Sequence, residues 1–284
     1  MPKRNDATLA TDIKIYNQMF PYLMQKRCDS LVYYGIEVEM TNAVNYIRMK
    51  NKEAGTKKYR LFDVVLASML RTMALKPAMN RFISNYHYWQ RQEYSFNFVV
   101  KKDLTEEAPE RNAIVKFQPE MTFEEIARIT YDAIEEARTS DESGDEAIIK
   151  NFLKLPKFLL KFVFRILKWL DTIGKYPKAL QEVDGLHVST FIANLGSINV
   201  ANPPFHHLYE WGTTSLFVTM GKLHRKRLID DKDNEYIKDT MEMGITVDER
   251  IAEGFYFMKT MKLLQYHLEH PETLDEAPDL SEVH

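Results

Sequence analysis

Two adjacent histidines and a nearby carboxylate are the side chains of this sequence best suited to move a proton. His206 and His207 lie in the aromatic segment NPPFHHLYEWG, and Glu210 follows three residues after His207. Imidazoles titrate near neutral pH, so either ring could act as a base or contact a ligand. Packing is the commoner role of such a pair. A metal site needs at least three convergent, regularly spaced ligands, and we expect no metal here.

Composition narrows the classes of protein that could use such groups. The 284 residues carry a net charge of -3, which argues against a nucleic-acid partner. The single cysteine, Cys28, cannot form an internal disulfide, and we expect it to be buried as a small apolar residue. Neither a signal peptide nor a membrane-spanning stretch is recognisable. These features predict a cytoplasmic protein.

The elements that must position these side chains alternate between strands and helices. Alternating or β-branched and aromatic stretches predict strands at 30–40, 82–88, 94–101, 113–118, 188–193, 215–220 and 241–247. Helical spacing predicts helices at 43–52, 61–74, 122–138 and 255–268. Thr41 is a plausible N-cap, 82–88 and 94–101 are expected to pair, and the turn-rich run at 230–234 suggests a hairpin. This order predicts an α/β sandwich.

The segment 153–170 has a different pattern from the other predicted helices. Basic residues recur at spacings of three and four while most of the residues between them are apolar: Lys154, Lys157, Lys161, Arg165 and Lys168. Such a helix could lie on a membrane surface or dock a partner. The commoner alternative, a helix packed on its own domain or trimer, is the favoured interpretation.

Three stretches together resemble one acyltransferase family. The run DERIAEG at 248–254 is similar to a DHRxxDG signature, and TFIANLGS at 190–197 is similar to TFTISNLG, with the strand ending in Gly221 and Lys222 after it. The segments 33–46 and 61–80 resemble the first strand and helices of that domain. The chain thus resembles the chloramphenicol acetyltransferase and 2-oxo acid dehydrogenase acyltransferase catalytic domains. The resemblance implies a two-layer sandwich with a mixed sheet, here with an extra amphipathic helix near 153–170.

The resemblance also implies a mechanism from which two parts are missing. In that family a histidine activates the thiol of coenzyme A or dihydrolipoamide, and a serine hydroxyl stabilises the oxyanion. Glu249 stands at the histidine position, and a glutamate, with an ordinary pKa of about 4.3, is a weak base for a thiol unless burial raises that pKa. Ala193 stands at the serine position, so the oxyanion function is lost. His206 or His207, in a loop that the resemblance places at the active-site channel, could supply a replacement base or contact a ligand. Ser197 could replace the serine only if its loop is rearranged.

Other motif positions are expected to be structural or to line the channel. Asp248 and Arg250 match the signature and suggest a structural ion pair. Glu253 stands at the motif's aspartate position, which in the family pairs with an arginine, and it keeps the negative charge for such a structural role. Gly254 is expected to permit a close approach of the chain before the last helix. Asn194, Gly196 and His206 are the positions that the resemblance places near a coenzyme A channel.

Two functions follow from this comparison of motifs. The first is a non-catalytic relative, a pseudoenzyme that keeps the fold as a binding or scaffold module. The alternative is an active acyltransferase that uses Glu249 or a channel histidine to move an acyl group from CoA to a small acceptor. No cofactor is expected to be bound permanently, although coenzyme A or acyl-CoA could serve as substrate. The resemblance implies a homotrimer with its site between subunits.

The domain boundaries follow from the same patterns. We expect a flexible N-terminus at 1–12, an acyltransferase-like domain at 13–270, and a mobile acidic tail at 271–284. Within the domain, 139–170 is expected to be a polar linker and the inserted basic helix.

Overall fold

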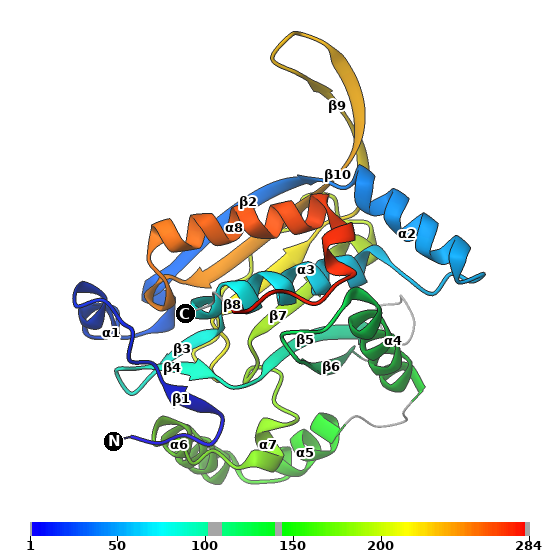
Figure 1. Cartoon of the computed structure of the whole chain (residues 1–284). Helices are drawn as coiled ribbons and strands as arrows, with labels where there is room; N and C mark the ends of the chain where they lie inside the picture. The colour runs from blue at the N-terminus through cyan, green and yellow to red at the C-terminus, as the bar shows by residue number, and fades with distance from the viewer. Residues whose placement is uncertain (1, 102–109, 140–143, 282–284) are drawn as a thin grey trace.

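One mixed sheet runs through the molecule (Figure 1). The structure, a computed structural model, describes residues 2–101, 110–139 and 144–281. The main path of the sheet, in spatial order, is β2 (Leu31–Glu39), β10 (Glu235–Asp248), β8 (Leu216–Met220), β7 (Thr190–Asn194), β5 (Tyr94–Lys101) and β6 (Glu110–Phe117). β7 lies parallel to both β5 and β8, and the other pairs are antiparallel. The predicted α/β sandwich with a mixed sheet is confirmed.

Because side chains alternate along each strand, one face of the sheet packs into the core and the other faces away from it. Ile192, Val218 and Ile245 are paired across β7, β8 and β10, and all three are fully buried in the core. Their neighbours along the same strands, among them Phe191 and Phe217, point to the opposite side because successive side chains alternate. We call this opposite side the outer face of the sheet.

Four helices cover the core face. They are α2 (Thr41–Glu53), α3 (Leu61–Leu75), α4 (Phe123–Thr139) and α8 (Gly254–Glu269). α3 is apolar on nearly every side, and all of its residues from Phe62 to Ala74 are buried, which identifies it as the central helix of the core. Thr41 is not the N-cap of α2, because Met40 holds that position and Thr41 Oγ1 instead accepts a hydrogen bond from the Asp239 amide.

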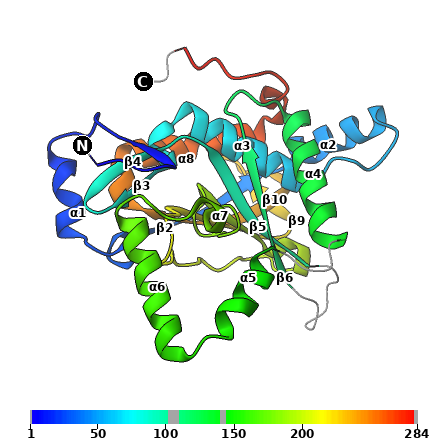
Figure 2. The same ribbon diagram turned by 90° about the horizontal axis from the view of Figure 1, so that it is seen from below.

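The other side of the sheet carries a separate group of helices. Figure 2 shows α5 (Gly144–Leu153) and α6 (Lys157–Thr172) on the side opposite to α3 and α8, and Figure 1 shows the short α7 (Lys178–Gln181) beside them. The helix expected at 153–170 corresponds to α6, which begins four residues later, and α5 precedes it in a segment for which no helix was expected. Pro156 separates them, because its extended ψ of 143° cannot continue α5 and it becomes the N-cap of α6.

Helix α6 is packed on one face only. Leu167 is its one buried residue, whereas Phe158, Phe162 and Trp169 are 75%, 57% and 59% exposed. Within the single chain, α6 therefore packs on its own domain through one face, as the favoured interpretation of a helix packed on its own domain or trimer expects. Among the described residues, no helix combines the length and apolar character needed to cross a bilayer.

A small second sheet ties down the N-terminus. Its strands lie in the order β1 (Ala7–Leu9), β4 (His87–Arg91), β3 (Arg81–Ser84). The expected pairing of 82–88 with 94–101 is wrong, because the turn at Asn85 and Tyr86, both at positive φ, folds β4 back on β3. Within 1–12, the segment expected to be a flexible N-terminus, β1 pairs with β4 and Ala7 is buried.

The predicted turn at 230–234 joins a hairpin whose first strand was not predicted. β9 (His224–Ile229) pairs with the first half of β10, which begins at Glu235 and is much longer than expected. Asp230 Oδ1 accepts hydrogen bonds from the amides of Lys232 and Asn234, which closes the turn. The charged, mostly exposed β9 lacks the apolar alternation that identifies a strand, so the sequence pattern missed it.

The acidic C-terminal segment, expected to be mobile, is attached to the core through residue 276. Leu274 is 1% exposed, and the buried Arg71 on α3 donates hydrogen bonds to the carbonyl oxygens of Thr273 and Glu276. Asp275 accepts a hydrogen bond from Tyr46 and pairs with Lys50 at 2.8 Å. The acidic composition of this segment predicted mobility, and composition alone could not reveal these contacts with distant residues.

Candidate functional site

The signature motif is built around a buried ion pair. Asp248 at the end of β10 is fully buried, and Arg250, two residues later, is 3% exposed. The guanidinium Nε lies 2.8 Å from Asp248 Oδ1 and Nη2 lies 2.6 Å from Oδ2, a two-point contact that fixes both side chains. The structural ion pair expected for these two residues is present.

Neighbouring segments complete the hydrogen bonding of this pair. Ser30 Oγ donates to Asp248 Oδ1 at 2.9 Å, and Arg250 Nη1 donates to the Met24 carbonyl at 2.8 Å. A second buried guanidinium, that of Arg27, has its Nε 4.0 Å from Asp248 Oδ2. Arg27 also donates to the carbonyl oxygens of Tyr209 and Gly212. The pair therefore joins the start of β2, the loop before β8 and the end of β10.

The other motif residues lie at the surface. Glu249 is exposed, and within the described residues its carboxylate has no hydrogen-bond or ion-pair partner. Glu253 pairs with Lys14 at 2.6 Å and not with an arginine. Gly254 begins α8, and a Cβ added there would meet open space, so the expected close approach of the chain at this glycine is wrong.

The second motif forms a closed turn at the end of β7. Asn194 caps a short 3-10 helix (Leu195–Ile198) by accepting the Ser197 amide, and Ser197 Oγ donates back to the Asn194 carbonyl at 2.7 Å. A Cβ on Gly196 would come within 2.6 Å of the Gly221 carbonyl oxygen, which explains the glycine. Ser197 is thus occupied by its own turn. Ala193, one residue before, contributes only a methyl group to the outer face.

His206 and His207 pack against the same outer face. The His206 ring is parallel to Phe217 with its centroid 4.1 Å away, and Phe217 in turn is stacked on Phe191 at 4.8 Å. His206 Nδ1 lies 2.7 Å from the His207 carbonyl oxygen. His207 is exposed and stacked on His206 at 4.8 Å. The geometry suits packing for His206 and leaves the His207 ring accessible to a ligand.

The predicted site residues fall into two groups within one chain. Ala193 lies beside Thr219 near the end of β8, whereas Glu249 follows the residues that pair with the beginning of β8 at Leu216. Five residues of strand separate the two positions along the sheet, a distance of about 16 Å. Residues 193–197 are therefore brought together at one end, and residues 248–254 at the other.

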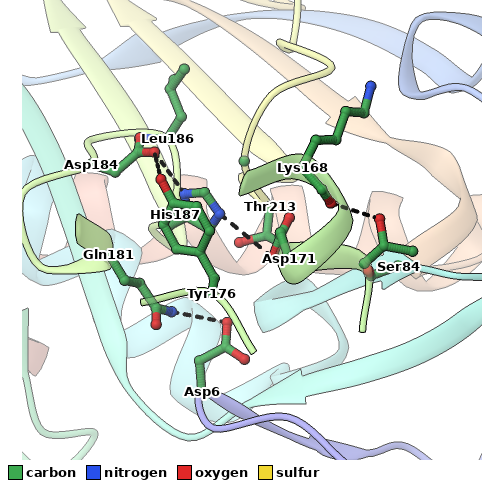
Figure 3. A network of polar contacts seen from close by, with 12 residues as sticks. Asp6, Ser84, Lys168, Asp171, Tyr176, Gln181, Asp184, Leu186, His187 and Thr213 are labelled. Carbon is green, nitrogen blue, oxygen red and sulfur yellow. Dashed lines mark hydrogen bonds and ion pairs between the residues drawn. The ribbon is translucent and has the colours of Figure 1, made fainter. Parts of the chain in front are cut away.

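Sequence reasoning missed a buried histidine held between two carboxylates. Figure 3 shows His187 between Asp184 and Asp171, which lie on different segments. His187 Nδ1 is 3.0 Å from Asp184 Oδ2, and Nε2 is 3.6 Å from Asp171 Oδ1. Tyr176 stacks on the imidazole at 4.4 Å, and Arg4 from the N-terminal segment binds Asp171 at 2.7 Å. The spacing of Asp184 and His187 was visible in the sequence, but Asp171 and Arg4 are distant along the chain.

Electrostatics indicate a structural role for His187. Burial alone would lower its pKa, but the carboxylates of Asp171 and Asp184 outweigh burial, and the pKa is raised above its usual value. Burial would raise the pKa of Asp171, yet His187 and Arg4 hold it down at about 2. The two carboxylates therefore favour the charged ring, which suits an ion-pair role better than that of a general base. The cluster joins the N-terminus, the end of α6 and the segment before β7.

Two further expectations concern individual surface groups. Cys28 is exposed, not buried as expected, because its short 3-10 segment lies on the surface and its amide donates to the Glu210 carboxylate. Among the described residues, one trio could present ligands to a metal: Glu37, His224 and Glu242. Lys226 already contacts Glu37 at 2.6 Å and supplies the positive charge there.

The arrangement of elements matches solved acyltransferase structures. A structure of the cubic core of the pyruvate dehydrogenase multienzyme complex is 12% identical, covers 91% of this chain and 88% of its own, and has a TM-score of 0.60. Dihydrolipoamide acetyltransferase from Azotobacter vinelandii has the same identity and coverage, with a TM-score of 0.61. Chloramphenicol acetyltransferase is 13% identical, covers 93% and 98%, and has a TM-score of 0.54.

Sequence comparison adds no relative to these structures. No family model matches the chain, and no curated protein is significantly similar to it. At 12–13% identity the likeness shows the fold, so the chain has the fold of chloramphenicol acetyltransferase and of dihydrolipoamide acetyltransferase catalytic cores.

Proposed function

We propose that this chain is a non-catalytic relative of the acyltransferases, a homotrimer that uses their fold as a binding or scaffold module. The observation that carries the proposal is the pair Glu249 and Ala193. The first is an exposed carboxylate without a partner within the described residues, and the second has no hydroxyl. An exposed carboxylate is a poor base for a thiol, and losing one oxyanion donor typically costs about 100- to 1000-fold in rate.

The position of the other polar groups supports the same proposal. Ser197 is bound into its own turn, and His206 is stacked on Phe217. His187, although it is an imidazole, is buried between the carboxylates of two aspartates. His207 alone combines an imidazole with exposure near the outer face, and it supports the alternative of an active transferase for a small acceptor.

The homotrimer is supported by the solved structures and by the layout of the two motifs. The similar structures include a cubic core of a multienzyme complex. In this chain the groups at 193–197 and 248–254 lie about 16 Å apart along the sheet. A site that used both groups would need them from two copies of the chain. Sedimentation velocity of the purified protein tests the assembly, and a monomer at micromolar concentration would refute it.

A coenzyme A titration with a thiol-release assay tests the loss of catalysis. We expect no release of CoA from acetyl-CoA in the presence of small alcohol, amine or thiol acceptors. Release that is abolished by Glu249→Gln or by His207→Gln would overturn the proposal and identify the replacement base. Glu253→Gln is the matched control, since it removes a carboxylate from the same motif without touching either candidate. Calorimetry on the same samples separates CoA binding from CoA turnover.

A further inference from the structure

A mainly apolar cavity lies between the outer face of the sheet and helices α5 and α6. Its volume is about 540 Å³, within the range of small-molecule sites. The floor is made of Asn97, Val99 and Phe191 from β5 and β7. The walls come from the two helices and from the segments before β7 and β8, and their apolar members include Ile149, Phe152, Phe164, Leu167, Leu180, Leu186 and Trp211.

One buried polar atom in the floor lacks a partner. Asn97 is fully buried, and its Nδ2 donates to Asn112 Oδ1 at 3.1 Å and to the Gly185 carbonyl at 3.2 Å. These two bonds fix the orientation of the amide and leave Oδ1 without a hydrogen bond. A Cβ on Gly185 would approach Asn97 Nδ2 to 2.1 Å, so the glycine allows this contact. A buried acceptor without a donor costs free energy that a bound ligand could recover.

The charges around the cavity restrict the ligand further. Its described lining includes the carboxylates of Asp184 and Glu110 and no lysine, arginine or histidine. An anionic ligand, including the phosphates of a nucleotide, would meet no counter-charge from these described residues. We propose that the cavity binds a neutral, mainly apolar molecule with one hydroxyl group, which donates its hydrogen bond to Asn97. This ligand proposal does not depend on whether the chain has lost catalysis.

Calorimetric titration of the full chain with 1-decanol and with decyl methyl ether tests this site. The ether has a chain of the same length but no donor. We expect the alcohol to bind about tenfold more tightly, the usual effect of one hydrogen bond. Equal affinities, or no binding of the alcohol, would overturn the proposal.

Two matched variants locate the site. Val99 is 40% exposed at the rim, so Val99→Trp should fill the cavity without disturbing the core and weaken decanol binding at least tenfold. Ile198→Trp makes a similar change at a 55% exposed side chain that does not line the cavity, and it should bind like the parent chain. If Val99→Trp bound decanol normally, the ligand would be elsewhere and the assignment wrong.

A different observation, the outward face of α6, carries a second inference. Phe158, Phe162 and Trp169 share this face at helical spacing and are all more than half exposed. A row of cations follows one side of it: Lys157, Lys161, Arg165 and Lys168. Among the described residues none of the four has an ion-pair partner. Exposed aromatic side chains beside unpaired cations are typical of helices that lie in the surface of an anionic bilayer.

We infer that α6 lies on an anionic lipid surface, with its aromatic side chains inserted and its cations at the headgroups. Co-sedimentation with vesicles of phosphatidylglycerol and phosphatidylcholine should exceed that with phosphatidylcholine alone at least tenfold. Phe162→Ser should weaken binding about tenfold, as expected for one inserted aromatic ring, and Lys161→Glu should weaken it severalfold.

Two surface substitutions on α8 provide the controls. Phe255→Ser and Lys259→Glu alter an exposed aromatic and a cation on the other side of the sheet and should leave vesicle binding unchanged. Absence of binding to anionic vesicles would overturn the inference. If Phe162→Ser instead dissociated the oligomer, the face would be an interface between copies of the chain, and the inference would equally be wrong.

Discussion

Ala193 and Glu249 lie toward opposite ends of β8, separated by about five residues of strand. Neither side chain can bridge a distance of about 16 Å, so the two motifs cannot form one site within a single chain. The buried contacts of the signature motif stabilise the fold: Asp248 binds Ser30 and Arg250, and Arg250 in turn donates to the Met24 carbonyl.

Breaking the buried pair of the signature motif should destabilise the fold strongly. Asp248→Asn leaves Arg250, and the adjacent Arg27, without their carboxylate in a buried environment. We expect a loss of about 3–5 kcal/mol in the free energy of unfolding, measured by urea denaturation. Glu253→Gln removes the exposed pair with Lys14 from the same motif and should cost less than about 1 kcal/mol. Equal effects would refute the structural role assigned to Asp248.

The His187 cluster should make stability depend on pH on the alkaline side. Its folded pKa is raised, so the protonated ring stabilises the fold fully below its unfolded pKa of about 6.5. This stabilisation is lost as the pH rises through the folded pKa. Thermal unfolding between pH 6 and 9 should show the decrease, and His187→Gln should remove most of it. His207→Gln, at an exposed ring, is the control and should leave the profile unchanged.

His267 should act in the opposite direction. Burial, with a contribution from Arg71, lowers its pKa to about 4, and its Nδ1 lies 3.0 Å from Thr273 Oγ1. Between about pH 6.5 and pH 4 the unfolded chain therefore binds a proton at this histidine that the folded chain does not bind. The free energy of unfolding decreases as the pH falls through this range. The expected loss is about 2–3 kcal/mol by denaturant titration. A His267→Gln variant with the same acid sensitivity as the parent would contradict this account.

The attachment of the C-terminal segment can be tested through Arg71. Arg71→Met removes the donors to the Thr273 and Glu276 carbonyls, and a hydrogen bond from a charged group typically contributes about 1.5–3 kcal/mol. Limited proteolysis with a glutamate-specific protease should cut the variant faster at Glu272 and Glu276. Arg48→Met changes an exposed arginine on α2 and serves as the control. Identical cleavage rates in the two variants would show that the segment is held by other contacts.

Local patterns were sufficient for much of the fold. α3 and α8 follow from apolar spacing, and the strands at β2, β7 and β8 follow from alternation and β-branched residues, because these signals act over one element. The resemblance of DERIAEG and TFIANLGS to known motifs supplied the order in which the elements assemble. β9 and α5 were missed, the first because its residues are charged and the second because the polar run at 139–146 predicted a linker.

The parts that could not be predicted depend on contacts between distant residues. β1 exists because β4 offers it an edge, and Arg71 fixes a segment some 200 residues away. His187 lies near Asp184 in the sequence, yet its setting depends equally on Asp171 and Arg4. The cavity at Asn97 required the placement of the inserted helices across the sheet.

The two faces of α6 have a mechanical consequence. Phe164 and Leu167 on its inward side line the cavity, while Phe158 and Phe162 point outward from the same helix. If α6 shifted when its outward face bound a surface, the shape of the cavity would change. Binding at the outward face would then be linked to the affinity of the cavity for its ligand. By reciprocity, a ligand that fixed α6 from within would alter the strength of its outward contacts by the same factor.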